Sequence, residues 1–158
     1  LGPEGKGLCT WLMLWPALVV VAGRLGLDFS ATYFGRTEPA TRPAIRTVLG
    51  PLAWIAGSGL AALFFGLALL ARHSSGIGQP VLLAVSMAAG PLGLYVALAQ
   101  GLLLGCARVR AYNILALLVP ALYTGALFAV WLVRPALVRV ELVIGLWTGA
   151  YALAGLAA

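Results

Sequence analysis

Arg24 and Asp28 are ionisable residues at the end of an apolar stretch, and their spacing could let them act together at a site. They stand four residues apart, so on one helix they would share a face and could form an ion pair. A charge inside hydrocarbon costs about 2.5–3.5 kcal/mol, so it requires a partner, a water-filled cavity or a place near headgroups. The pair could line a cavity for an anionic or polyhydroxylated ligand. Alternatively, Arg24 extends to the membrane interface and Asp28 caps the helix end.

Three further polar side chains lie in apolar stretches and could contact a ligand: Tyr95, Gln100 and Tyr123. Gln100 could bond a sugar hydroxyl, although bonding to a neighbouring helix is the commoner use of Gln in membranes. The two tyrosines could stack on a sugar, or they could pack between helices and anchor at the interface. Together with Arg24 and Asp28, these residues form the candidate substrate-binding set.

Enzymatic motifs are missing from the sequence. It contains no G-x-S-x-G, no H-E-x-x-H and no G-x-x-x-x-G-K, and its His, Asp and Glu residues show no metal spacing. Cys9 and Cys106 also lack the spacing of a metal site, and we expect them at opposite membrane faces, too far apart for a disulfide. We therefore expect a protein that is not an enzyme, with no catalytic residues, metal or cofactor.

The elements that must position these residues are membrane-spanning helices. The chain is 63% hydrophobic and 9% charged, whereas soluble domains contain about 25% charged residues. At about 1.5 Å per residue, a block of roughly 20 apolar residues crosses a hydrocarbon core of about 30 Å. Five such blocks occur, at residues 8–28, 48–71, 80–104, 111–133 and 137–158. The sequence therefore predicts one all-α transmembrane region over residues 1–158, with 29–47 as a polar connection that is in part an interfacial amphipathic helix.

The net charge of +6 comes from basic residues that lie almost entirely between the apolar blocks. This placement predicts contact with membrane lipid headgroups and argues against nucleic acid as a partner. One side of the membrane receives Arg36, Arg42, Arg46, Arg108 and Arg110, and the other receives Lys6, Arg72, Arg134 and Arg139. The small excess predicts that the turn containing Arg108 is cytoplasmic.

Two glycine pairs and three prolines predict how the helices pack and bend. Gly101 with Gly105, and Gly145 with Gly149, have the small-xxx-small spacing that allows close helix approach. A proline within a span removes a backbone hydrogen bond and is expected to kink the helix. The prolines in question are Pro16, Pro91 and Pro120.

Several short segments resemble the bacterial polysaccharide flippases. Residues 1–8 read LGPEGKGL and lead into an apolar span that ends in RLGLD at 24–28. Residues 33–36 read YFGR, 42–49 are basic and then apolar, and 100–105 read QGLLLG before RVRAYN at 108–113. In this order, the segments resemble turns and spans of the O-antigen-type transporters of lipid-linked oligosaccharides, in the multidrug/oligosaccharidyl-lipid/polysaccharide exporter superfamily.

The resemblance implies that the chain is part of a six-helix N-terminal lobe, with a second lobe of the same chain as its partner. The start at Leu1 and the apolar end also lead us to expect a piece of a longer protein. The implied activity is alternating-access transport of an undecaprenyl-linked oligosaccharide across the bacterial inner membrane, for polysaccharide or lipopolysaccharide biosynthesis. The role of Arg24 rests on physical argument, because this charge is not a recurring position of the family. The alternatives are another carrier of the superfamily and a structural membrane subunit without transport.

Overall fold

The chain folds into a bundle of helices, and no strand occurs in residues 2–75 and 80–158, which the computed structural model describes. The α-helices are α1 (Pro3–Arg24), α2 (Leu27–Thr37), α3 (Arg42–Ser75), α4 (Pro80–Met87), α5 (Ala89–Gly105), α6 (Val109–Val133) and α7 (Val140–Ala157), with short 3₁₀ turns η1 (Pro39–Thr41) and η2 (Pro135–Leu137). Five helical stretches are long and apolar enough to cross a membrane, as the sequence predicts: α1, α3, α4 with α5, α6 and α7. The all-α, multi-span fold class is confirmed.

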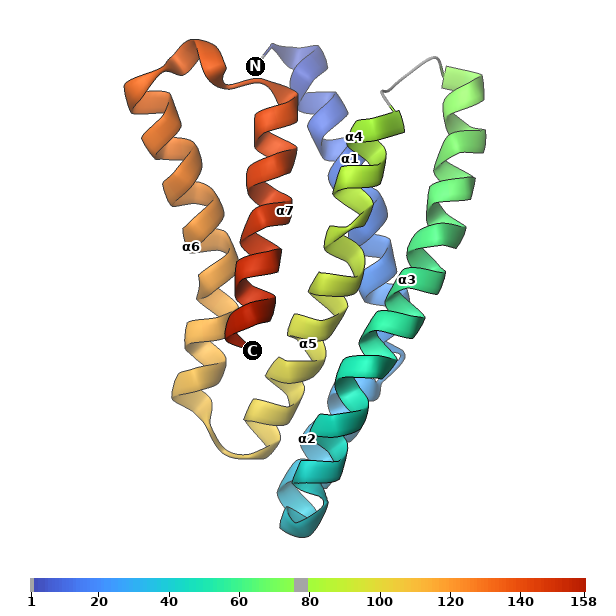
Figure 1. Cartoon of the computed structure of the whole chain (residues 1–158), viewed down its shortest axis with the longest axis vertical. Coiled ribbons are helices and arrows are strands. Elements are labelled where there is room, and N and C mark those ends of the chain that lie inside the picture. The colour runs from blue at the N-terminus through green and yellow to red at the C-terminus, as the bar shows by residue number, and fades with distance from the viewer. Residues whose placement is uncertain (1, 76–79) are drawn as a thin grey trace.

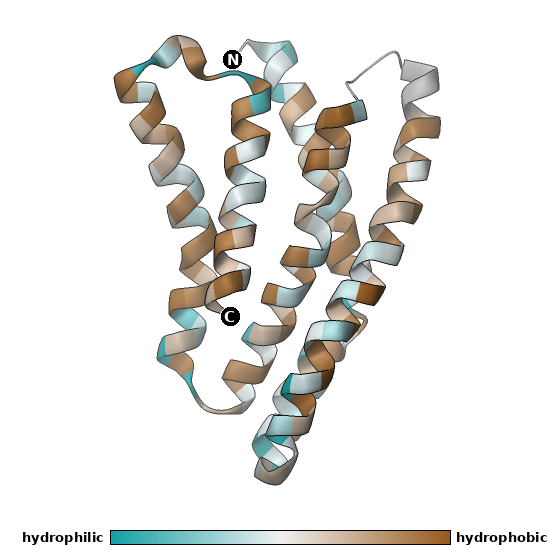
Figure 2. Cartoon of the chain, viewed as in Figure 1, coloured by the Kyte–Doolittle hydropathy of each residue, from teal (hydrophilic) through white to brown (hydrophobic). Residues whose placement is uncertain are grey.

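The helices run alternately between two ends of the bundle. In Figure 1, α1, α4 and α7 begin at the upper end, whereas α3 and α6 begin at the lower end. The hydropathy colouring in Figure 2 shows hydrophilic residues on α2 and the start of α3 and mainly apolar residues along the spans. Cys9, in the second turn of α1, and Cys106, directly after α5, therefore lie toward opposite ends, and both thiols are free as expected.

The connection between the first two spans is more helical than the sequence suggests. Helix α1 ends at Arg24, and Leu25 and Gly26 take left-handed conformations, with φ of 37° and 80°. Helix α2 then continues to the lower end, so α1 ends four residues before the predicted span end at 28, and α3 begins six residues before the predicted span start at 48. The 34 residues of α3 extend over about 51 Å, more than the hydrocarbon needs, so the helix projects beyond it.

Pro91 shapes the third span. It has no N–H to bond the carbonyl of Met87, and the helix is interrupted at Ala88 between α4 and α5. The predicted disturbance at Pro91 is therefore present. By contrast, α1 and α6 remain continuous through Pro16 and Pro120.

Helix α5 is the central helix of the bundle. It contacts α1, α2, α3, α6 and α7, and most of the α4–α5 span is buried. Glycines on α5 allow this close packing: a Cβ atom built on Gly90 would lie 2.9 Å from Val19, and one on Gly93 would lie 2.8 Å from Val20. Helix α6, in contrast, is fully buried only at Leu115 among its described residues, although it packs against α5 and α7. Its exposed side is apolar and compatible with lipid.

Candidate functional site: an arginine-lined pocket

A pocket of about 430 Å³ opens near the lower end of the bundle, between the start of α3, the second half of α5 and the end of α7. Its walls combine apolar side chains with three arginines and one tyrosine. The lining residues are Arg42, Pro43, Arg46, Leu49, Tyr95, Ala99, Leu102, Leu103, Cys106, Arg108 and Ala158. None of these described lining residues has a carboxylate side chain, so the side-chain charge of the pocket is positive.

Two of the arginines come from the first turns of α3. Arg42 and Arg46 are four residues apart, so they project from one helix face toward α5. Arg42 is held in place because its Nε donates a 2.7 Å hydrogen bond to the carbonyl oxygen of Gly35 in α2. A guanidinium has five N–H donors, so four remain free for a ligand.

The third arginine is positioned by the turn that ends α5. Ala107 has a φ of 58°, which reverses the chain immediately after the helix. The N–H of Ala107 bonds the Leu104 carbonyl at 3.0 Å, and the N–H of Arg108 bonds the Leu103 carbonyl at 2.9 Å. This pair of bonds is the Schellman arrangement of a helix C-terminus. It places Arg108 at the pocket wall opposite α3.

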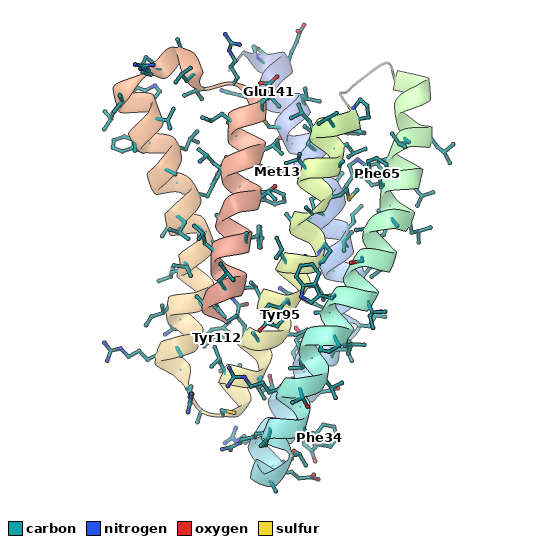
Figure 3. The ribbon with its side chains drawn as sticks, in the orientation of Figure 1. Met13, Phe34, Phe65, Tyr95, Tyr112 and Glu141 are labelled. Atoms are coloured by element: carbon teal, nitrogen blue, oxygen red, sulfur yellow. The ribbon has the colours of Figure 1, made fainter. Side chains whose placement is uncertain are left out.

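Tyr95 lies at the inner side of the pocket, as Figure 3 shows near the middle of the bundle. Its ring is bracketed by two glycines on neighbouring helices. A Cβ atom built on Gly50 would lie 4.0 Å from Cε2, and one on Gly155 would lie 3.9 Å from Cδ1. The pocket can therefore bind an anion through the guanidinium groups, which match phosphate and carboxylate geometry, with Tyr95 available for stacking or hydrogen bonding.

Arg24 and Asp28 form the expected ion pair, but outside this pocket. Arg24 Nη1 lies 3.9 Å from Asp28 Oδ2, and the side chains are 45% and 20% exposed. The expectation of one continuous helix face is wrong, because the chain breaks at Leu25 and Gly26 between them. Instead, Arg24 is the last residue of α1 and Asp28 lies in the first turn of α2, where each charge complements the helix dipole. Asp28 Oδ1 also accepts a 3.0 Å hydrogen bond from the Phe29 N–H.

Gln100 and Tyr123 also lie away from the pocket. Five residues separate Gln100 from Tyr95, which places it about 140° around α5 at 3.6 residues per turn. Its side chain is half-buried and makes no hydrogen bond within the described part of the chain. Tyr123 is half-buried on α6, on the far side of Pro120 from the pocket. Of the five candidate residues, the structure therefore brings only Tyr95 to the arginines.

No protein-family model, curated protein or solved structure matches this chain. The function of the site therefore follows only from its lining residues and their geometry. The sequence offered one usable signal for it, the four-residue spacing of Arg42 and Arg46 followed by Leu49 on the same face. The sequence uses Arg42, Arg46 and Arg108 to orient the protein in the membrane and, within residues 42–49 and 108–113, for the resemblance to the flippases. It does not predict a shared site, because the convergence of these residues depends on the packing of α3 against α5.

Proposed function

We propose that this chain belongs to a polysaccharide flippase, which moves an undecaprenyl-linked oligosaccharide across the bacterial cytoplasmic membrane by alternating access. The arginine-lined pocket would hold the anionic headgroup, while the lipid tail stays in the bilayer. This role places the headgroup at Arg42, Arg46, Arg108 and Tyr95. Arg24 and Asp28 then act as an internal ion pair that lowers the cost of two charges near the break between α1 and α2.

One observation carries the proposal: two sequence segments that resemble the flippase family meet at this pocket. Residues 42–49 supply Arg42, Arg46 and Leu49, and residues 100–113 supply the α5 end and Arg108. Segments far apart in the chain thus contribute the positive charge of a single site. If the arginines served only as interface anchors, the charges would not need to converge on a shared pocket.

The electrostatics of the pocket suit a headgroup entering from one leaflet. Three guanidinium groups, with no carboxylate side chain among the described lining residues, attract a phosphate-type anion, although Arg46 and Arg108 are exposed and their attraction is screened by salt. The apolar walls from α5 would exclude water and strengthen these contacts. A sugar attached to the anion would lie next to Tyr95.

The test is transport by the full-length protein in proteoliposomes that contain a lipid-linked oligosaccharide. Movement is measured as the fraction of glycan that becomes accessible to a glycan-binding protein on the opposite side. We expect Arg46→Gln and Arg108→Gln each to slow movement about tenfold or more, the effect of losing a hydrogen bond to a charged group of about 1.5–3 kcal/mol. Arg110→Gln is the matched control, because Arg110 is exposed near the same turn but does not line the pocket.

Two results would contradict the proposal. Wild-type protein that moves no lipid-linked glycan would favour the structural membrane subunit. Arg46→Gln and Arg108→Gln variants that transport as fast as Arg110→Gln would remove the pocket from the transport path. A carrier of the same superfamily with another cargo would be indicated if a different anionic amphiphile moved and its movement depended on Arg46 and Arg108.

A further inference from the structure

A second cavity, the α2–α3 groove, lies next to the arginine pocket on the adjoining face of α3. It has a volume of about 320 Å³ and is almost wholly apolar. Its lining residues are Leu27, Ser30, Ala31, Phe34, Ala44, Ile45, Val48 and Leu49. Leu49 also lines the pocket, so the two cavities adjoin at this residue.

The sequence of α2 produces the groove wall directly. Leu27, Ser30, Ala31 and Phe34 follow the i, i+3, i+4, i+7 pattern of one helix face. Ser30 leaves that face apolar because its hydroxyl donates a 3.1 Å hydrogen bond to the Gly26 carbonyl. From Leu27 to Phe34 the wall extends for about 10 Å along the helix axis.

Contacts between α2 and α5 set the depth of the groove in the bundle. Gly101 packs against the backbone of Asp28, and Gly105 packs against the backbone of Thr32 and Ala31. The groove therefore lies level with the last two turns of α5, immediately inside the turn that contains Arg108. Basic residues at helix ends lie at the headgroups, and Arg46 lies between Ile45 and Val48 of the α3 wall, so the groove lies where the outermost hydrocarbon meets the headgroups. Phe34, at its lower end, points outward in Figure 3 and is 45% exposed.

Arg42 lines the arginine pocket and lies next to the lower end of the groove. Its Nε bonds the carbonyl of Gly35, the residue after Phe34, and it precedes Ile45 by about one helical turn. The nearby carboxylate of Glu38 forms no ion pair with it within the described residues. A guanidinium with further donors thus lies beside the lower end of an apolar groove, an arrangement that matches a phosphate joined to a hydrocarbon chain.

We propose that the α2–α3 groove binds one acyl chain of an anionic phospholipid, whose phosphate is held by Arg42. The lipid would be a resident of the leaflet at the Arg108 turn and not the transported substrate. The charge of Arg42 selects an anionic headgroup over a zwitterionic one, and the groove selects a lipid over free phosphate. This inference does not depend on the proposed function. Arg42 also lines the arginine pocket, so its replacement can affect both sites, whereas Ala44 lines only the groove.

The test is lipid retention by the full-length protein purified from nanodiscs that contain equal amounts of phosphatidylglycerol and phosphatidylcholine. Native mass spectrometry counts each lipid that stays bound. We expect wild-type protein to retain phosphatidylglycerol preferentially, and Arg42→Gln and Ala44→Leu each to reduce its retention about tenfold. Ala44→Leu fills the groove from an exposed position. The matched controls are Arg110→Gln and Ala121→Leu, an exposed arginine and an exposed alanine outside both cavities.

Equal retention of the two lipids by wild-type protein would overturn the proposal, as would an Ala44→Leu variant that keeps its phosphatidylglycerol. Arg42→Gln also removes the bond to Gly35, so its fold is checked by circular dichroism and thermal unfolding. If that variant does not fold, Ala44→Leu decides the result. Ala44 does not line the arginine pocket, so loss of lipid binding and loss of transport can be told apart.

Discussion

A Cβ atom built on Gly105 would lie 2.5 Å from the carbonyl oxygen of Thr32. The same relationship repeats one turn earlier, where a Cβ on Gly101 would lie 2.6 Å from the Asp28 carbonyl oxygen. Thr32 adds a polar link, because its hydroxyl lies 2.9 Å from the Gly101 carbonyl oxygen and 2.8 Å from that of Asp28. This close contact packs α2 along α5, and thereby places Gly35 and Arg42 beside the pocket.

Alanine at either glycine should loosen this contact. Gly101→Ala and Gly105→Ala each force backbone apart, and we expect a loss of about 1–3 kcal/mol in the free energy of unfolding. Gly145→Ala and Gly149→Ala are the controls, because no atom lies within 4 Å of a Cβ built at either position. Unfolding of the purified protein in detergent is the measurement. Equal effects at all four positions would show that the α2–α5 contact is not tight.

Thr32→Val should weaken the same interface through its hydrogen bond. An interhelical hydrogen bond in a membrane protein contributes about 0.6 kcal/mol on average, and we expect a loss of this size in unfolding experiments. Thr10→Val is the matched control, because the Thr10 hydroxyl bonds only Lys6 of its own helix. The two variants should differ; if their stabilities are the same, the bond from Thr32 to Gly101 contributes nothing.

The break between α1 and α2 should depend on backbone conformation alone. Gly26 has a φ of 80° with open space around its Cα, so Gly26→Ala is expected to cost about 1–2 kcal/mol. Leu25 has a φ of 37°, a conformation that glycine adopts more easily than leucine. We therefore expect Leu25→Gly to destabilise the protein less than a glycine substitution in a helix interior does. Gly59→Ala, at an open helical position in α3, should be neutral or stabilising. Thermal unfolding of the three variants tests this, and a destabilising Gly59→Ala with a neutral Gly26→Ala would refute it.

Cys106 should report which side of the membrane the pocket faces. It is partly exposed and lines the pocket, whereas Cys9 is only 8% exposed. A membrane-impermeant maleimide should therefore modify Cys106 in inside-out vesicles and not in right-side-out vesicles, if the Arg108 turn is cytoplasmic as the charge count predicts. Cys9→Ala provides the background without the second thiol. Modification in right-side-out vesicles alone would reverse the orientation.

The site was less predictable than the fold. Hydropathy and length predict the spans because each helix in lipid must satisfy its own backbone groups within one continuous apolar segment. The ion pair of Arg24 and Asp28 could also be predicted, since four-residue spacing keeps the groups near each other. The exact break between them is harder to predict: Gly26 is a local signal for a helix end, but nothing in the local sequence indicates the left-handed conformation of Leu25. The two glycine pairs have the same four-residue spacing, yet among the described residues only Gly101 with Gly105 makes a close contact. The spacing alone therefore does not show which pair packs against a neighbouring helix.

By itself, the sequence determined that this protein is a helical membrane bundle with basic residues at the ends of its spans, since apolar length and charge placement act locally along the chain. Only the tertiary structure decided that Arg42 and Arg46 meet Arg108 and Tyr95 at one pocket, and that α2 packs along α5. The physical reason is that a helix apolar on all sides carries no amphipathic stripe to show which face meets a neighbour. Rotation and partner choice then depend on backbone contacts such as the one between Gly105 and Thr32.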